Sequence, residues 1–126
     1  MLDESSHGAV SRLRGLRVLI VDDSWHLATT VKSRLEEVGM VIVGAVATAG
    51  DAVRLANELA PKVAVVDIKL RDGMAHGLID QLHDLEVRVV VVTAFNALVT
   101  PPVKAGAILP KPFSGDELLA ALLRTT

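Results

Sequence analysis

The sequence contains no cysteine and almost no aromatic residues. Without cysteine, neither disulfide bridges nor thiolate metal sites can form. The aromatic residues are limited to Trp25, Phe95 and Phe113, so the core has to be built from Val, Leu, Ile and Ala. Such aliphatic residues are the usual filling of a parallel sheet covered by helices. The composition therefore favours an α/β domain.

Two further classes of protein are disfavoured by the charges and the apolar runs. Acidic and basic residues are mixed along the chain, the formal net charge is −2, and no basic block indicates binding to nucleic acid. The longest apolar run, residues 87–92, is far too short to cross a bilayer. Residues 1–7 lack the basic start and the apolar stretch of a secretory signal. We therefore expect a cytoplasmic protein that binds neither nucleic acid nor a membrane.

The length of 126 residues fits one domain and is too short for two independent cores. Residues 1–15 are polar, mixed in charge and without sustained periodicity, and they end at Gly15. We expect residues 1–15 to form a mobile N-terminal tail and residues 16–126 to form the domain.

Short apolar runs alternate with helical patterns through the rest of the chain. The runs predict buried strands, and leucine and valine at helical spacing predict the helices between them. The predicted strands cover 17–21, 41–46, 63–67, 87–93 and 106–109, and the predicted helices cover 25–38, 50–59, 76–85 and a last segment capped by Ser114. Such alternation predicts a doubly wound, five-stranded parallel sheet with right-handed crossovers. Because Pro101 and Pro102 cannot lie inside a helix, the fourth helix is expected to be short, displaced or absent.

Four of the predicted strands end on polar side chains, namely Asp22 with Asp23, Asp67, Thr93 and Lys111. In open sheets of this kind, ligands bind outside the carboxyl ends of the strands. If the four strands are neighbours, three carboxylates, one hydroxyl and one ammonium share a single crevice.

The chemistry of this set is restrictive. Three carboxylates close together repel one another unless a cation or protons intervene. Mg²⁺ suits the site, because it takes oxygen ligands and leaves a position for a phosphate oxygen. An ammonium and a hydroxyl add the charge and the hydrogen bond that stabilise a phosphoryl group during transfer, and a carboxylate can be the nucleophile. Taken singly, each of these residues also has a structural explanation, such as a helix cap for Asp22 or Asp23.

Four motifs, in this order, resemble the response regulator receiver domains of two-component signalling. They are Val-Leu-Ile-Val-Asp-Asp-Ser at 18–24, Val-Val-Asp-Ile-Lys-Leu at 65–70, Val-Val-Thr-Ala at 91–94 and Gly-Ala-Ile-Leu-Pro-Lys-Pro-Phe at 106–113. The resemblance covers roughly residues 16 to 124. It implies a flavodoxin-like strand order of 2-1-3-4-5.

The resemblance also implies a role for each residue of the crevice. Asp67 matches the phosphoacceptor, and Mg²⁺ would be held by Asp22, Asp23, Asp67 and the backbone carbonyl of Lys69. Thr93 matches the hydroxyl that turns toward the phosphoryl group. Lys111 matches the lysine that pairs with that group, and its peptide bond to Pro112 is expected to be cis.

The implied partners are a histidine kinase or phosphotransfer protein upstream and an unknown protein downstream, reached through protein–protein contacts. The resemblance implies no enzyme beyond the chain's own phosphorylation and dephosphorylation. The simplest form is a stand-alone receiver, and the chain as a piece of a longer regulator remains an alternative.

The sequence departs from the family pattern in three places. Ile108 stands where an aromatic residue is usual on the fifth strand. Thr93 and Lys111 are closer in sequence than is typical, by about one helical turn. The loop after Asp67 lacks the common proline. These departures concern the readout of phosphorylation, because none of them removes a residue of the crevice.

Two other functions compete with a phosphorylated receiver. The first is a degenerate receiver that acts as an unphosphorylated interaction module, which Ile108 and the altered fourth helix keep open. The second is a phosphatase of the haloacid-dehalogenase type, which places its nucleophile on the first strand and a second aspartate two residues later. Ser24 occupies that second position here.

Overall fold

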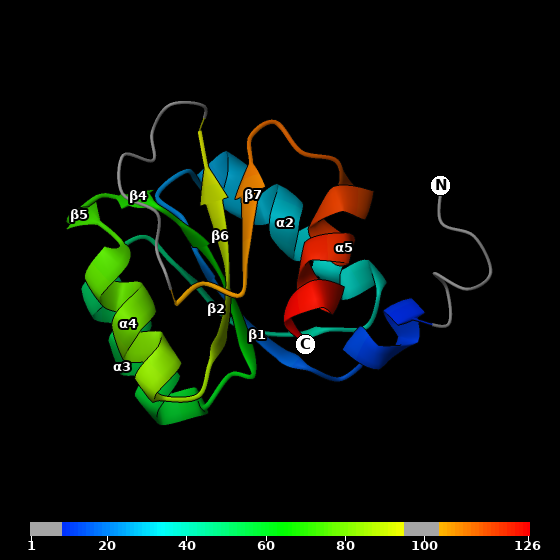
Figure 1. Cartoon of the computed structure of the whole chain (residues 1–126), viewed down its shortest axis with the longest axis horizontal. Coiled ribbons are helices and arrows are strands. Elements are labelled where there is room, and N and C mark those ends of the chain that lie inside the picture. The colour runs from blue at the N-terminus through cyan, green and yellow to red at the C-terminus, as the bar shows by residue number, and fades with distance from the viewer. Residues whose placement is uncertain (1–8, 95–103) are drawn as a thin grey trace.

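The computed structural model of the chain describes residues 9–94 and 104–126. At its centre is a five-stranded parallel sheet, shown in Figure 1, with strands in the order β2-β1-β3-β6-β7. Its strands are β1 (Arg17–Val21), β2 (Val41–Val46), β3 (Val63–Asp67), β6 (Arg88–Thr93) and β7 (Ala107–Pro110). Counted along the chain this is the order 2-1-3-4-5, so the predicted fold is confirmed. The two remaining strands, β4 (Lys69–Leu70) and β5 (Gly73–Met74), form a separate antiparallel hairpin.

Helices cover both faces of the sheet, as the doubly wound prediction requires (Figure 1). One face carries α2 (Trp25–Glu37) and α5 (Gly115–Thr125), and the other carries α3 (Ala49–Leu59) and α4 (His76–Asp84). The short or irregular fourth helix expected around Pro101 and Pro102 falls in residues 95–103, outside the described part of the chain.

The core divides into two aliphatic clusters because alternate residues of a strand point to opposite faces of the sheet. On β1, Val18 and Ile20 pack toward α2 and α5, whereas Leu19 and Val21 pack toward α3 and α4. All four side chains are almost completely buried, and each contributes about 1.5–3 kcal/mol relative to an exposed position. Burial on both faces explains why the strands read as nearly continuous apolar runs.

The folded part of the chain begins before β1. Residues Ser11–Leu13 form a short 3₁₀ helix, η1, and Leu13 is fully buried against α5. This differs from the expected mobile tail over residues 1–15. The apolar residues around Leu13 are too few to show a periodic pattern, although Leu13 packs into one end of the core. Residues 1–8 lie outside the described part of the chain, and the proposed limits of the domain, 16–126, stay a prediction.

None of the helices described here has both the length and the apolar character that a membrane span requires.

Candidate functional site

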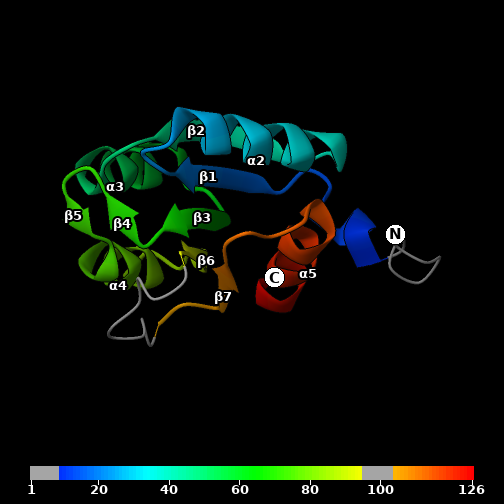
Figure 2. The same cartoon turned by 90° about the horizontal axis from the view of Figure 1, so that it is seen from above.

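The strands β1, β3 and β6 are neighbours in the sheet (Figure 2), so their carboxyl ends lie side by side at one edge of the sheet. Asp22 follows β1 directly, Asp67 is the last residue of β3, and Thr93 is the last residue of β6. In the register of β3 and β6, Asp67 is the partner of Val92. The topology therefore brings these residues together, as the rule for strand ends predicts.

The three predicted carboxylates form one cluster. Asp22, Asp23 and Asp67 each offer an oxygen, and these oxygens all lie within 4.8 Å of one another. Asp22 is 9% exposed and Asp67 is 7% exposed, whereas Asp23 is exposed to solvent. The carboxylate of Asp22 accepts a hydrogen bond from the backbone N–H of Ser24 at 2.8 Å, which fixes its orientation.

The charge of Asp22 is only partly compensated by its surroundings, which include Lys111. Burial raises the pKa of Asp22, the hydrogen bond from Ser24 lowers it, and the nearby carboxylate of Asp67 raises it again. The net direction is upward, so the ionised form of Asp22 is disfavoured in the protein alone. A cation bound among the three carboxylates would reverse this balance.

Lys111 supplies one positive charge to the cluster. Its ammonium Nζ lies 3.3 Å from Oδ2 of Asp67. Its backbone N–H donates to the carbonyl of Thr93 at 2.7 Å, so the end of β7 is tied to the end of β6. The peptide bond to Pro112 is cis, as expected from the resemblance. The structure thus places Lys111 beside Asp67.

The remaining predicted site residues also lie at this edge. Thr93 is 6% exposed, and its hydroxyl donates to the carbonyl of Ala94 at 3.2 Å. The backbone N–H of Lys69 donates to Oδ1 of Asp67 at 3.3 Å. Lys69 therefore lies next to the cluster, and the role of its carbonyl as a metal ligand stays a prediction.

The donor set suits Mg²⁺. Every side-chain donor in the cluster is a carboxylate oxygen, and hard divalent cations bind oxygen ligands. Two of the carboxylates are largely buried and one is exposed, so an ion held here would keep contact with water. This agrees with the usual coordination of Mg²⁺, which binds through one or two carboxylates and retains several water molecules.

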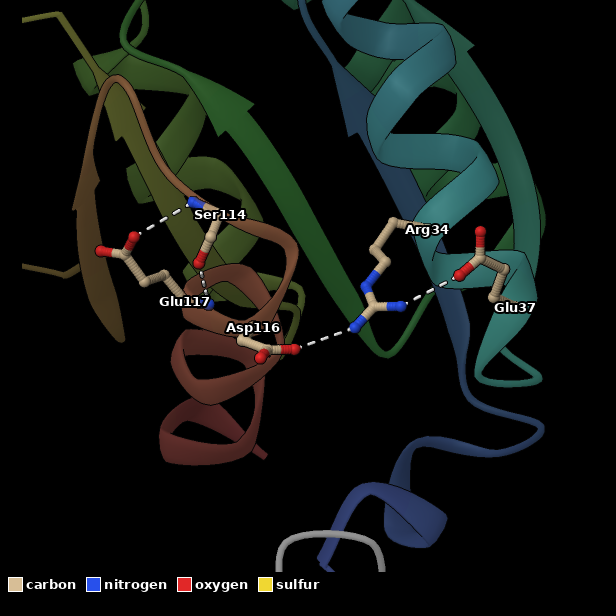
Figure 3. A network of polar contacts seen from close by, with 5 residues as sticks. All are labelled: Arg34, Glu37, Ser114, Asp116 and Glu117. Carbon is tan, nitrogen blue, oxygen red and sulfur yellow. Dashed lines mark hydrogen bonds and ion pairs between the residues drawn. The ribbon is translucent and has the colours of Figure 1, made fainter. Parts of the chain in front are cut away.

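Two neighbouring helices are joined next to the loop that carries Lys111. Arg34 of α2 contacts Asp116 of α5 at 3.0 Å and Glu37 at 2.9 Å (Figure 3). Ser114 caps α5 as predicted, in a reciprocal pair of hydrogen bonds with Glu117 that Figure 3 also shows. The cap that fixes the start of α5 therefore lies three residues after Lys111.

Sequence reasoning missed the contacts of one polar residue in the loop after Asp67, namely Asp72. It lies in the turn of the hairpin β4–β5, where the sequence indicated only a loop. Its carboxylate accepts hydrogen bonds from the backbone N–H of Ala49 at 3.0 and 3.1 Å and of Gly50 at 3.5 Å. The bond from Ala49 is the main cause of the lowered pKa of Asp72. Its only sequence signal is an Asp-Gly pair, which marks a turn without naming a partner.

Comparison with known proteins gives a consistent family. The model of the response regulator receiver domain family matches residues 18–123. The chain is 30% identical to the acid tolerance regulatory protein ActR of Rhizobium meliloti (strain 1021), over 96% of this chain and 66% of that protein. It is 34% identical to the transcriptional regulatory protein PdtaR of Mycobacterium tuberculosis (strain H37Rv), over 84% of this chain and 54% of that protein. The chain thus spans between about half and two thirds of the length of these relatives.

A solved structure agrees with the fold. The signal receiver domain of a modulated diguanylate cyclase from Desulfovibrio desulfuricans G20 is similar with a TM-score of 0.81 and 26% identity, covering 88% of this chain and 93% of that one. Since the family model matches most of the chain and the sheet has the strand order expected of that family, the chain belongs to the response regulator receiver domain family.

Proposed function

We propose that this receiver is phosphorylated on Asp67, with Mg²⁺ as cofactor and with a histidine kinase or phosphotransfer protein as donor. The observation that supports this most strongly is the pairing of Asp67 with Lys111 at 3.3 Å inside a cluster of three carboxylates. The proposed nucleophile therefore lies beside a cation and beside the carboxylates proposed to bind the metal. The family is a signalling family, and we propose cytoplasmic action through contacts with a downstream protein.

The proposed reaction is a phosphoryl transfer between a histidine and an aspartate. An oxygen of Asp67 attacks the phosphorus of a phosphohistidine, and the bond from phosphorus to the imidazole nitrogen breaks. The electron pair of that bond stays on the nitrogen, and the product is an acyl phosphate on Asp67. Because negative charge is spread over the phosphoryl oxygens in the transition state, nearby positive groups lower the barrier.

Each residue of the cluster has its own proposed role in this transfer. Lys111 places an ammonium against Asp67 and can pair with a phosphoryl oxygen once Asp67 carries the acyl phosphate. Thr93 places a hydroxyl at the end of the neighbouring strand, where it can donate to another phosphoryl oxygen. Asp22, Asp23, Asp67 and the carbonyl of Lys69 would hold Mg²⁺. The bound ion would offset the charge of the carboxylates and of the phosphoryl oxygens.

The alternative phosphatase assignment finds no support at Ser24. In that class of enzyme a second aspartate would occupy this position, whereas the hydroxyl of Ser24 accepts a hydrogen bond from the N–H of Leu27 at 3.3 Å and caps α2. Ser24 is thus explained as a helix cap.

An unphosphorylated interaction module remains the second candidate. The residue that favours it is Ile108, which is 40% exposed on β7 at the position where the family usually has an aromatic residue. An isoleucine there cannot follow the movement of Thr93 in the way the family's aromatic residue does.

Incubation with Mg²⁺ and acetyl phosphate tests the proposal, with intact mass as the readout and Asp67→Ala as the control. We expect one added phosphoryl group that requires Mg²⁺ and is lost in the variant. Titration of Mg²⁺ against the fluorescence of Trp25 provides an independent readout, because Trp25 lines a groove together with Asp22 and Asp23. Absence of both the adduct and the binding would contradict phosphorylation and favour the interaction module.

A further inference from the structure

The hairpin β4–β5 leaves the site immediately after Asp67 and returns to α4 (Figure 2). Its base is well anchored. The N–H of Ile68 donates to the carbonyl of Val92 at 2.9 Å, and the N–H of Ala75 donates to the carbonyl of Ile68 at 2.7 Å. Ile68, Leu70 and Ala75 are buried. Lys69 lies within this hairpin and is paired with Met74.

The tip of the hairpin has a different anchor. Each strand of the hairpin has only two residues, and an isolated pair of such length has little stability of its own. At the tip, Asp72 accepts hydrogen bonds from Ala49 and Gly50, the first two residues of α3. The tip is therefore attached to two residues of α3 that lie 23 and 22 residues before Asp72 in the sequence.

The attachment matches what the start of a helix requires. The first N–H groups of an α-helix have no partner within the helix, and they favour negative charge. The hydroxyl of Thr48 accepts from the N–H of Asp51 at 3.2 Å, which satisfies the third residue of α3. Asp72 supplies the acceptor for the N–H groups of Ala49 and Gly50, the first two residues of α3. The start of α3 is thus shared between a local cap, Thr48, and a distant one, Asp72.

We propose that Asp72 is a positioning residue for the metal site, an inference that rests on the proposed function. By attaching the tip of the hairpin to α3, Asp72 fixes the backbone of the strand that carries Lys69. The N–H of Lys69 holds one oxygen of Asp67, and its carbonyl is the proposed backbone ligand of Mg²⁺. Asp72 acts on the ion only through this backbone, and it is exposed at the surface.

A simpler explanation is that Asp72 serves only to stabilise α3. The two explanations can be separated because the hydroxyl of Thr48 caps the same helix end through the N–H of Asp51, a residue of α3 itself. Thr48→Ala removes one hydrogen bond from α3 and leaves the hairpin attached, whereas Asp72→Ala removes the attachment as well. Asp72→Asn keeps an acceptor oxygen in place without the charge, so it separates anchoring from simple attraction between a carboxylate and Mg²⁺.

The test measures the dissociation constant of Mg²⁺ by Trp25 fluorescence and the free energy of unfolding without Mg²⁺, for the unaltered chain and the three variants. We expect Asp72→Ala to weaken Mg²⁺ binding about tenfold, the lower end of the range for outer-shell residues at metal sites. Asp72→Asn should restore most of the affinity. Thr48→Ala should lower the stability comparably and leave the affinity unchanged.

Several results would overturn the inference. They are unchanged Mg²⁺ binding in Asp72→Ala, equal weakening in Thr48→Ala, or equal weakening in Asp72→Asn, which would point to charge alone. If the unaltered chain bound no Mg²⁺, the proposed function itself would fail, and this result is distinct from the other three. Hydrogen exchange adds a second readout: Mg²⁺ should increase the protection of the amides of Ala49 and Gly50 in the unaltered chain and should not do so in Asp72→Ala, since coupling between two sites is reciprocal.

Discussion

The two ends of the central sheet differ in how their charged side chains are arranged. At the carboxyl end, Asp22, Asp23 and Asp67 crowd within a few ångströms of one another, and burial and mutual repulsion raise the pKa of Asp22. At the amino end, Arg17 begins β1 and Arg88 begins β6, and both are exposed to solvent. The guanidinium of Arg17 donates to the carbonyl of Leu59, at the end of α3, over 2.6 and 3.2 Å.

The amino end of the sheet has contacts that favour stability, whereas the carboxyl end has contacts that are typical of a functional site. Cations near the last carbonyls of a helix are favourable, so the contact of Arg17 with the end of α3 should stabilise the fold. Like charges crowded in a partly buried site are unfavourable, and such strain is typical of functional sites. Substitutions at the two ends should therefore have opposite consequences.

The largest effect is expected at Lys111. Lys111→Met removes the ammonium beside Asp67 while keeping much of the apolar stem. The rate of phosphorylation by acetyl phosphate should fall roughly hundredfold, the usual scale for losing one group that stabilises a transition state. Lys62→Met at the amino end removes the same charge from an exposed position and serves as the control. Equal rates in the two variants would break the contrast between the ends.

The next effect concerns Asp22 and stability. Asp22→Asn removes one of the crowded charges and keeps an oxygen that can accept the hydrogen bond from Ser24. In Mg²⁺-free buffer at neutral pH, the melting temperature should rise by roughly 3 °C. Added Mg²⁺ should stabilise the unaltered chain and have a much smaller effect on the variant. A variant that is less stable than the unaltered chain would show that the repulsion is already relieved.

The difference in stability between Asp22→Asn and the unaltered chain should depend on pH. Because the pKa of Asp22 is raised on folding, its contribution to stability is present at acid pH and is lost as the pH rises through that raised pKa. The advantage of Asp22→Asn should therefore be largest near neutral pH and should vanish once Asp22 is protonated. Thermal unfolding of both chains across a pH series, without Mg²⁺, measures this. An advantage that is constant with pH would exclude the charge of Asp22 as its cause.

The smallest effect is expected at Arg17. Arg17→Gln removes the guanidinium that contacts the end of α3 and should lower the free energy of unfolding by about 0.5–1 kcal/mol. Chemical denaturation measures the change. Phosphorylation and Mg²⁺ binding should be unaffected, and a loss of either would mean that the two ends of the sheet are coupled.

Most of the sheet was predictable from the sequence because its central strands are buried on both faces. Residues 17–21 and 41–46 were predicted as strands with the bounds that the structure shows for β1 and β2. The side chains of the site were also predictable, since the carboxyl ends of parallel strands meet at one edge. The family resemblance added the roles of Asp67 and Lys111, and these roles stay predictions.

The features that escaped prediction depend on contacts between distant residues. Strands of two residues, such as β4 and β5, show no alternation that a sequence pattern can reveal. The hydrogen bonds of Asp72 join residues that only the fold brings together, as does the contact of Arg34 with Asp116. Ser114 and Glu117, by contrast, lie three residues apart, and the cap at Ser114 was predicted from the sequence.

Leu13 determines where this domain can be cut out of, or exchanged between, longer proteins. The family model begins at residue 18, five residues after Leu13. A chain shortened to that limit would lose a fully buried leucine and leave its contacts on α5 open to water. Removing a side chain of this size from a core costs about 2–5 kcal/mol, a large part of the stability of a small domain. Grafts of this receiver should therefore start before η1.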